Sequence, residues 1–239
     1  MNTFEKLRLY LFPKTVYESS DKELRIVDRI ENGEAVRVLF VKGARESGIY
    51  LEESKSADPL FYYMRTFKDI CTRNEGIHHV LMIGGAGLSF ARVFLHLDRK
   101  NTMTVIEKDQ RFIEIADRYF GIRADDRLSV HVMPGERYIA EVVQHKQESD
   151  APYDAIIIDA FDGKKIAKGL TTESVLKMMS TLLNPEGLFI MNAINDSGGN
   201  IAMHTYLTEE FLKKLFSHTE IIECENEGNC VLIASGRKI

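Results

Sequence analysis

The sequence predicts an α/β fold: a doubly wound, mostly parallel seven-stranded sheet that follows a small N-terminal antiparallel β-hairpin domain. Three observations predict it. From His79 onward, apolar strand-like runs alternate with amphipathic helix-like runs, and the chain ends in two apolar runs with no helix between them. The first 57 residues hold only short β-prone runs. Apolar strands bridged by helices are typical of a parallel sheet that is buried on both faces.

The first domain is expected over residues 1–57. Turn-forming segments such as SSDKE and ENGE separate its β-prone runs, and this spacing is typical of an antiparallel sheet made of hairpins. Residues 58–239 form the second domain, which begins with a helix. Asp58-Pro59 is a helix start signal, and the apolar residues behind it recur at helical spacing. We expect this helix to pack against the first strand of the second domain.

The second domain alternates strands and helices before it ends in a hairpin. Its last two apolar runs, TEIIECE and CVLIASG, are joined by a turn at 226–229, so the last strand must run antiparallel to its neighbour. A parallel doubly wound sheet that closes in this way is the fold of class I methyltransferase-like proteins. A nicotinamide-binding Rossmann domain would be expected to continue with another crossover. The preceding strand and helix pairs are VLMIG with LSFARVFLHL, TMTVIE with QRFIEIADRYF, LSVHVM with ERYIAEVVQ, YDAIIID with TESVLKMMSTLL, and GLFIMNAI with MHTYLTEEFLKKLF.

Composition and charge argue against several function classes. The 239 residues are 44% apolar and 28% charged, and the net charge of -5 argues against nucleic acid as the main partner, although a locally basic groove stays open. No apolar run reaches the roughly 18 residues of a membrane span, and the N-terminus lacks a signal-peptide core. We therefore expect a cytoplasmic protein. Cys71, Cys224 and Cys230 are not at metal-ligand spacing and the histidines are scattered, which predicts buried thiols and no metal.

The segment 79–109 predicts a nucleoside-binding half-site. A strand, a glycine turn with Gly84, Gly85 and Gly87, and a helix bring backbone N–H groups to one point. Glu107 ends the next strand, 20 residues after Gly87, which is about the offset of the ribose-binding acid in nucleotide folds. The turn lacks the third glycine of the dinucleotide fingerprint. The alternative for Glu107 is a solvated strand end.

Gly135 and Glu136 follow the third strand of the second domain, at the place that borders the adenine in this fold. An acidic group there can accept a hydrogen bond from the exocyclic amine. The alternative is that Glu136 only begins the next helix, where a negative charge is favourable. The two interpretations are compatible.

Asp159 and Asp162 follow three buried isoleucines, at the carboxyl end of a strand where ligands bind in open α/β sheets. Two carboxylates near a sulfonium nucleoside can attract a cationic amine, and one of them can accept its proton so that a neutral nitrogen attacks. The alternative is that these are acids of a loop after the strand, which cap the helix TESVLKMM or coat the surface. Further residues that can border or cover the same pocket are Asn192, Asn195, Asp196, Tyr62 and Tyr63.

These segments together resemble the spermidine synthase family, the aminopropyltransferases with a methyltransferase-like fold. The similarity spans about residues 15–195 and is greatest to a divergent bacterial branch. The N-terminal β-rich segment matches that family's small hairpin domain. The motifs that carry the resemblance are IGGAGLSFARVFL, VIEKDQRFIEIADRYFGI, DDRLSVHV, YDAIIIDAFDG and LTTESVLKMMSTLLNPEGLFIMN.

The resemblance implies a role for each matched residue. Glu107 would hold the ribose and Glu136 the adenine region. Asp159 would be the acid that activates the amine, and Asp162 the second acid of the family's D-x-x-D segment. Tyr62 would be a tyrosine on the substrate side. The family also implies decarboxylated S-adenosylmethionine or S-adenosylmethionine as co-substrate, a small amine acceptor and a homodimer.

This chain departs from the family on the amine side. Gly87 stands where the family's G-G-G-D-G-G turn has an acid that helps to hold the aminopropyl donor. Tyr63 and Met64 replace a histidine and a glutamate, and Lys164 and Lys165 follow Asp162 in place of the family's Asp-Pro-x-Gly-Pro loop. Each change makes a pocket for a polycation less negative.

Three functions remain open from the sequence. The first is transfer of an aminopropyl group from a sulfonium nucleoside to an amine, with Asp159 as the base. The second is transfer of a methyl or other alkyl group to a less cationic acceptor, which the two lysines would suit. The third is a non-catalytic nucleoside-binding or assembly module.

Overall fold

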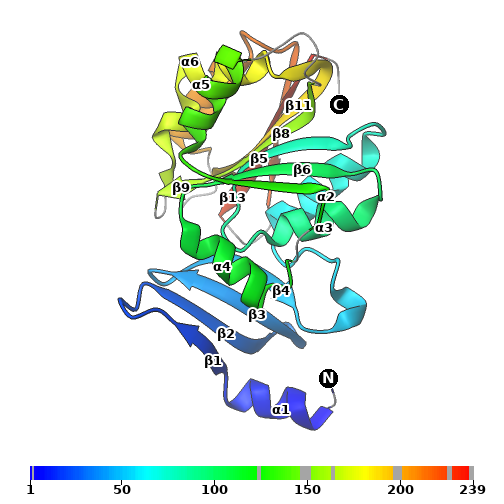
Figure 1. Cartoon of the computed structure of the whole chain (residues 1–239), viewed down its shortest axis with the longest axis vertical. Helices are drawn as coiled ribbons and strands as arrows, with labels where there is room; N and C mark the ends of the chain where they lie inside the picture. Colours follow the sequence, from blue (N-terminus) through cyan, green and yellow to red (C-terminus); the bar gives the residue numbers. More distant parts are fainter. Residues whose placement is uncertain are drawn as a thin grey trace.

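Two sheets organise the chain, with the N-terminal sheet at one end of the molecule beside helix α4 (Figure 1). The structure is a computed structural model. It describes residues 1, 3–122, 125–145, 152–162, 165–195, 201–224 and 228–236, and of residues 162 and 165 the backbone alone.

The N-terminal sheet is antiparallel, with strand order β1-β2-β3-β4. Tight turns with positive φ at Asn32-Gly33 and Lys42-Gly43 join β2 to β3 and β3 to β4, as the hairpin pattern predicts. A helix that the sequence analysis did not expect, α1 (Thr3–Leu11), precedes the sheet and buries none of its described residues. The strands are β1 (Lys14–Glu18), β2 (Leu24–Glu31), β3 (Glu34–Val41) and β4 (Ala44–Tyr50).

The main sheet has seven strands in the order β12-β13-β11-β8-β5-β6-β7. The pairs among β11, β8, β5, β6 and β7 are parallel, and β13 runs antiparallel to both β11 and β12. The expected doubly wound sheet with a closing hairpin is therefore confirmed. Its strands are β5 (His79–Gly84), β6 (Thr102–Glu107), β7 (Leu128–Val132), β8 (Tyr153–Asp159), β11 (Leu183–Ile194), β12 (His218–Glu223) and β13 (Asn229–Ser235).

Helices cover both faces of the main sheet. Alternate residues of β5, such as Val80 and Leu81, belong to two separate buried clusters. Helices α2 and α3 contribute to the first cluster, whereas α5, α6 and α7 contribute to the second. Burial of both faces explains why the inner strands β5, β8 and β13 are largely apolar. The helices are α2 (Tyr62–Arg73), α3 (Ser89–Leu97), α4 (Gln110–Tyr119), α5 (Gly135–His145), α6 (Glu173–Ser180) and α7 (Met203–Leu212).

Helix α2 begins later than expected. Its first residue is Tyr62 rather than a residue directly behind Asp58-Pro59, because Phe61 is extended, with φ -89° and ψ 148°. Leu60 and Phe61 are buried against β4, where Gly48 leaves room for them. The helix contacts α3 and β13 and shares a buried cluster with Val80 of β5.

Short elements complete the chain. Two antiparallel strands of two residues each, β9 (Phe161–Asp162) and β10 (Lys165–Ile166), follow β8. The sequence analysis placed a loop there. Two 3₁₀ turns, η1 (Glu53–Lys55) and η2 (Lys168–Thr171), lie before α2 and before α6.

The two sheets are joined by polar and apolar contacts. Arg37 of β3 pairs with Asp28 and also donates to the carbonyl of Tyr119 at the end of α4, at 3.0 Å. Ser47 of β4 hydrogen-bonds to Ser89 at the start of α3. A third buried cluster combines residues of the N-terminal sheet with Ala86, Ile115 and Phe120. The N-terminal sheet is therefore held against the carboxyl ends of the main strands.

Candidate active site

The strand order of the main sheet reverses between β5 and β8, and this switch point is where open α/β sheets bind ligands. Gly84 and Asp159 are register partners at the carboxyl ends of these two strands. Glu107 ends β6, the next parallel strand. The fold thus brings together the glycine turn, Glu107 and Asp159, which the sequence analysis selected from separate segments.

The turn after β5 has an unusual backbone. Gly84 and Gly85 have φ of +83° and +128°, a region that favours glycine. A Cβ on Gly84 would lie 2.3 Å from the carbonyl oxygen of Asp159, so glycine is required for the close approach of the two strand ends. Gly87 has a different role, because a Cβ there would lie 2.9 Å from the Oγ of Ser47 in β4. Gly87 is therefore a packing residue between the two sheets.

Glu107 is buried, with 5% of its surface exposed. Burial raises the pKa of its carboxyl group, while hydrogen bonds from the backbone of Asp109, Lys108 and Ala86 oppose that rise. The Oε1 atom accepts from the N–H of Asp109 at 3.0 Å. These bonds hold the carboxylate at the strand end beside the glycine turn. Glu107 is therefore not a solvated strand end.

Gly135 and Glu136 border the same cavity as Glu107. Gly135 begins α5, and a Cβ there would lie 2.4 Å from Ile83 of β5, so the helix start packs directly on the strand. Glu136 lies against the backbone of Gly169 in η2, where a Cβ would clash with its carboxylate. Glu136 therefore lies in the first turn of α5 and also borders the cavity, so the two interpretations of this residue are compatible in the structure.

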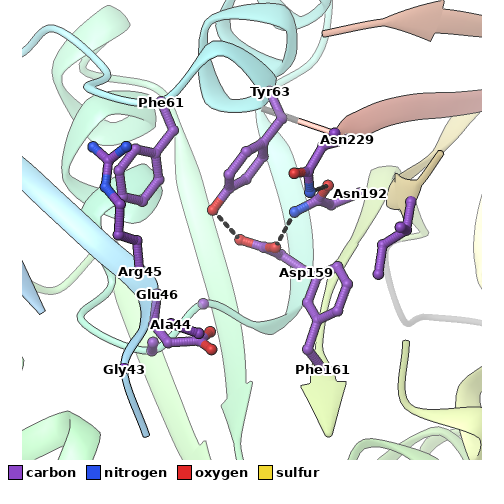
Figure 2. Close-up of a pocket in the computed structure, with 14 residues that line it drawn as sticks. Gly43, Ala44, Arg45, Glu46, Phe61, Tyr63, Asp159, Phe161, Asn192 and Asn229 are labelled. Carbon is purple, nitrogen blue, oxygen red and sulfur yellow. Dashed lines mark hydrogen bonds between the residues drawn. The ribbon is translucent and has the colours of Figure 1, made fainter. Parts of the chain in front are cut away.

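Asp159 is the central polar group of the site. It is 9% exposed and accepts two hydrogen bonds, from the Tyr63 hydroxyl at 3.1 Å and from the Nδ2 of Asn192 at 2.8 Å (Figure 2). The Nδ2 of Asn229 donates in turn to the Oδ1 of Asn192 at 2.7 Å. Burial raises the pKa of Asp159 to about 6, and the bonds from Asn192 and Tyr63 oppose the rise. Each carboxylate oxygen accepts one of the two bonds and keeps a further lone pair.

Two adjoining cavities meet at Asp159. The smaller one is lined by the glycine turn, Glu107 and Glu136. The larger one has a volume of about 560 Å³ and is lined by Phe61, Tyr63, Asn192 and other residues of distant segments. Five residues line both cavities and mark the junction: Glu46, Gly85, Ala86, Asp159 and Phe161.

Glu46 of β4 is the site residue that the sequence analysis missed. Figure 2 shows it reaching from the N-terminal sheet into the larger cavity. Burial, and repulsion from Asp159 and Glu107, raise its pKa to about 7. Its position near the start of a hairpin strand, directly after a turn, carries no local signal of function. Only the packing of the N-terminal sheet on the main sheet places it in the site.

The tyrosine expected on the substrate side, Tyr62, is the neighbour of the one that contacts Asp159. Tyr62 is 39% exposed and lies under the guanidinium of Arg65, outside the described cavity walls, whereas its neighbour Tyr63 is buried and bonded to Asp159. Successive helix residues point about 100° apart, so only one of the pair can face the site. Of the two tyrosines, Tyr63 contacts Asp159, and the substrate-side role of Tyr62 stays a prediction.

Other expected residues have mixed outcomes. Asn192 lines the larger cavity, and Asn195 forms an isolated bridge with Ile201. The backbone of Asp162 belongs to β9, but its side chain lies outside the described residues, as do Gly163, Lys164 and Asp196. The second catalytic acid therefore stays a prediction.

Two features are absent from the described part of the chain. Within it, no group of three or more His, Cys, Asp and Glu side chains is arranged to hold a metal ion. None of its helices has the length and apolar character needed to cross a bilayer.

The sheet order, the closing hairpin and the glycine turn at the switch point define a class I methyltransferase-like α/β protein. Within that class the chain belongs to the spermine/spermidine synthase domain family, whose model matches residues 62–227.

Three relatives illustrate the range of similarity. A polyamine aminopropyltransferase of Prochlorococcus marinus is 28% identical over 156 residues, which cover 63% of this chain and 51% of the relative. The chain spans about half the length of the curated aminopropyltransferases that it matches. A probable spermidine synthase of Corynebacterium glutamicum superposes with a TM-score of 0.74 at 20% identity, covering 95% of this chain and 81% of that one. Human methyltransferase-like protein 13 in complex with SAH gives 0.58 at 26% identity, covering 67% and 73%.

Proposed function

We propose that this chain is a transferase that binds decarboxylated S-adenosylmethionine or S-adenosylmethionine and moves an aminopropyl group to a small amine. The observation that carries the proposal is Asp159, a buried carboxylate at the junction of two cavities. We assign the nucleoside to the smaller cavity, because Glu107 and Glu136 line it at the carboxyl ends of the parallel strands, where open α/β sheets bind their ligands. The larger cavity then receives the acceptor.

The reaction assigned to the junction is a displacement at carbon. The neutral nitrogen of the acceptor attacks the methylene carbon that is bonded to the sulfonium sulfur, a new C–N bond forms, and the S–C electron pair stays on sulfur. The nucleoside leaves as neutral methylthioadenosine, and the nitrogen releases one proton. Asp159 accepts that proton, because a pKa of about 6 leaves most of this carboxyl group ionised at neutral pH while it remains a competent base. Tyr63 and Asn192 fix its orientation.

Methyl transfer is the second candidate, and one observation favours it. The turn that approaches the donor has no acid at Gly87, and Ser47 fills the space that a side chain would need. The similarity to the human methyltransferase-like protein 13, whose structure contains SAH, is consistent with a donor that keeps its carboxylate. The third possibility is a nucleoside-binding module without catalysis, in which only the smaller cavity has a function.

Calorimetry and product analysis distinguish these functions. The protein is titrated with decarboxylated S-adenosylmethionine and with S-adenosylmethionine, then incubated with each donor and putrescine. Tighter binding of the decarboxylated donor, with methylthioadenosine and an aminopropylated amine as products, supports aminopropyl transfer. Tighter binding of the carboxylated donor supports methyl transfer. Binding without product over a range of amines supports the module, and no binding of either donor contradicts all three.

A further inference from the structure

Glu46 is the acidic residue besides Asp159 among the five described residues that line both cavities. It comes from β4 of the N-terminal sheet, whereas Asp159 comes from β8 of the main sheet, so the two acids stand on walls built by different parts of the chain. Gly85 and Ala86 lie between these walls and line both cavities. When a donor binds along the glycine turn, its sulfonium group therefore lies near Glu46.

Ser47, the residue next to Glu46 in β4, explains why an acid is found on this strand and not on the glycine turn. Ser47 hydrogen-bonds to Ser89 and blocks any side chain at Gly87, since a Cβ there would lie 2.9 Å from its Oγ and 3.4 Å from Phe120. A side chain at position 87 of the turn would therefore require Ser47 to move. The adjacent strand residue, Glu46, brings a carboxylate to the same region from the opposite wall.

The charge of Glu46 is unbalanced in the described part of the chain, where it forms no ion pair. The cation beside it in sequence, Arg45, is engaged elsewhere: its Nη2 lies 2.7 Å from Glu31, and its guanidinium lies over the ring of Phe61. The charged groups that most affect Glu46 are Asp159 and Glu107, both acidic. A cation that enters the junction removes this repulsion, so the site favours a positively charged ligand group.

We infer that Glu46 recognises the cationic aminopropyl tail of the donor and makes the site prefer a decarboxylated tail to one that carries a carboxylate. This inference rests on the proposed function, in which Asp159 is reserved for the proton of the acceptor. The ammonium of a decarboxylated tail pairs with Glu46, whereas the carboxylate of S-adenosylmethionine would add a further negative charge to three acids. Glu46 is thus the residue that selects the donor.

The test compares three nucleosides in calorimetric titrations: decarboxylated S-adenosylmethionine, S-adenosylmethionine, and methylthioadenosine, which has no charged tail. Glu46→Gln should weaken binding of the decarboxylated donor by about ten- to a hundredfold, because a charge-assisted hydrogen bond is lost. Methylthioadenosine should bind the variant within about twofold of the wild-type protein, since its contacts do not include the tail. Glu114→Gln, an exposed acid of α4, is the matched control and should leave all three affinities unchanged.

A second measurement needs no variant. The pKa of Glu46 is about 7 in the free protein, and a bound ammonium lowers it, so the decarboxylated donor should release about half a proton more than methylthioadenosine at pH 7. The difference is obtained from binding enthalpies in two buffers of unlike ionisation enthalpy. The other charged groups that line the cavities with Glu46 are Arg45, Glu107, Lys108, Glu136 and Asp159.

The outcomes separate this inference from the proposed function. Three outcomes overturn the role of Glu46 while nucleoside binding stands. In the first, Glu46→Gln weakens the binding of the decarboxylated donor and of methylthioadenosine equally. In the others, both ligands release the same number of protons, or the wild-type protein prefers S-adenosylmethionine. Failure of the wild-type protein to bind any of the three nucleosides contradicts the proposed function, and the inference falls with it.

Discussion

The walls of the smaller cavity come mainly from the ends of successive strands and the turns that follow them, such as Gly84-Gly85, Glu107 and Gly135-Glu136. The walls of the larger cavity come from β4, the start of α2, β8, β11 and the start of β13, which lie far apart in the chain. The smaller cavity, which we propose holds the nucleoside and call the nucleoside half, is thus built mainly from successive strand, turn and helix units of the main sheet. The larger cavity, which we propose holds the acceptor and call the amine half, forms only when the two sheets and the closing hairpin pack together.

The resemblance to the family assigned residues well in the half built from strand ends and less well in the half that depends on assembly. In the nucleoside half, the expected glycines and acids stand at the strand ends. In the amine half, Tyr63 rather than Tyr62 contacts Asp159, Gly87 packs on Ser47, and Glu46 enters from the other sheet. Backbone geometry constrains the first half strongly, because the turn at Gly84 leaves no space for a side chain.

The largest expected effect separates chemistry from nucleoside binding. Asp159→Asn should lower kcat by about 10²- to 10⁴-fold, the range for loss of a general base, while the affinity for the nucleoside changes by no more than about threefold. Steady-state rates of methylthioadenosine formation and calorimetry measure the two quantities. Unchanged turnover would contradict the role of Asp159 as base, and loss of nucleoside binding would mean that the two halves cannot be separated.

The buried charge of Asp159 also predicts a pH dependence of folding. Its pKa is raised from 3.8 to about 6, so the folded protein holds this proton more tightly than the unfolded chain does. Stability is therefore lost as the pH rises between these two values, and the loss is up to about 3 kcal/mol above pH 6. Because asparagine does not titrate, the free energy of unfolding of the wild type should decline relative to that of Asp159→Asn between pH 4 and pH 7. Urea unfolding of both proteins across this range measures the difference, and parallel pH curves would contradict the assigned burial of the charge.

A smaller effect is expected from the ribose acid. Glu107→Gln should raise the Kd of methylthioadenosine by about ten- to a hundredfold. The carboxylate can accept charge-assisted hydrogen bonds from both ribose hydroxyls, whereas the neutral amide of glutamine has a single acceptor oxygen. At saturating donor, kcat should stay within about threefold of the wild-type value. Titration calorimetry and initial rates measure these effects. A variant that loses kcat while it keeps its nucleoside affinity would place Glu107 in the amine half.

Sequence reasoning reached the nucleoside half because each of its elements is local. A strand, a glycine turn and an acid at the next strand end occur within 79–109, and the buried backbone needs glycine at 84 and 85. The doubly wound, mostly parallel sheet with its antiparallel end also followed from the alternation of strands and helices and from the closing hairpin. Hydrophobic periodicity is a strong signal over such lengths.

The amine half was predicted less well because its residues are paired only by tertiary packing. The apolar stripe of α2 includes Tyr63, but the resemblance to the family suggested Tyr62. The two rings point in different directions from the helix, and only the packing of α2 decides which of them faces Asp159. Nothing local distinguishes Glu46 from other acids of hairpin strands. Helix α1 was also missed, since its mixed apolar and charged residues bury none of the described side chains and so give no core-facing pattern.

The smallest expected effect tests the tyrosine that contacts Asp159. Tyr63→Phe removes the hydroxyl that donates to Asp159 at 3.1 Å, a bond that favours the ionised carboxylate and lowers its pKa. The acid limb of the pH–rate profile should therefore move to higher pH, and kcat at pH 7 should fall by about three- to tenfold. Tyr62→Phe is the matched control, because that ring is exposed and stacks on Arg65, and its profile should overlay the wild type. The reverse result, with Tyr62→Phe impaired and Tyr63→Phe normal, would support the substrate-side role of Tyr62. Since the two variants remove the same atom from adjacent residues, any difference between them reports which face of α2 completes the amine half of the site.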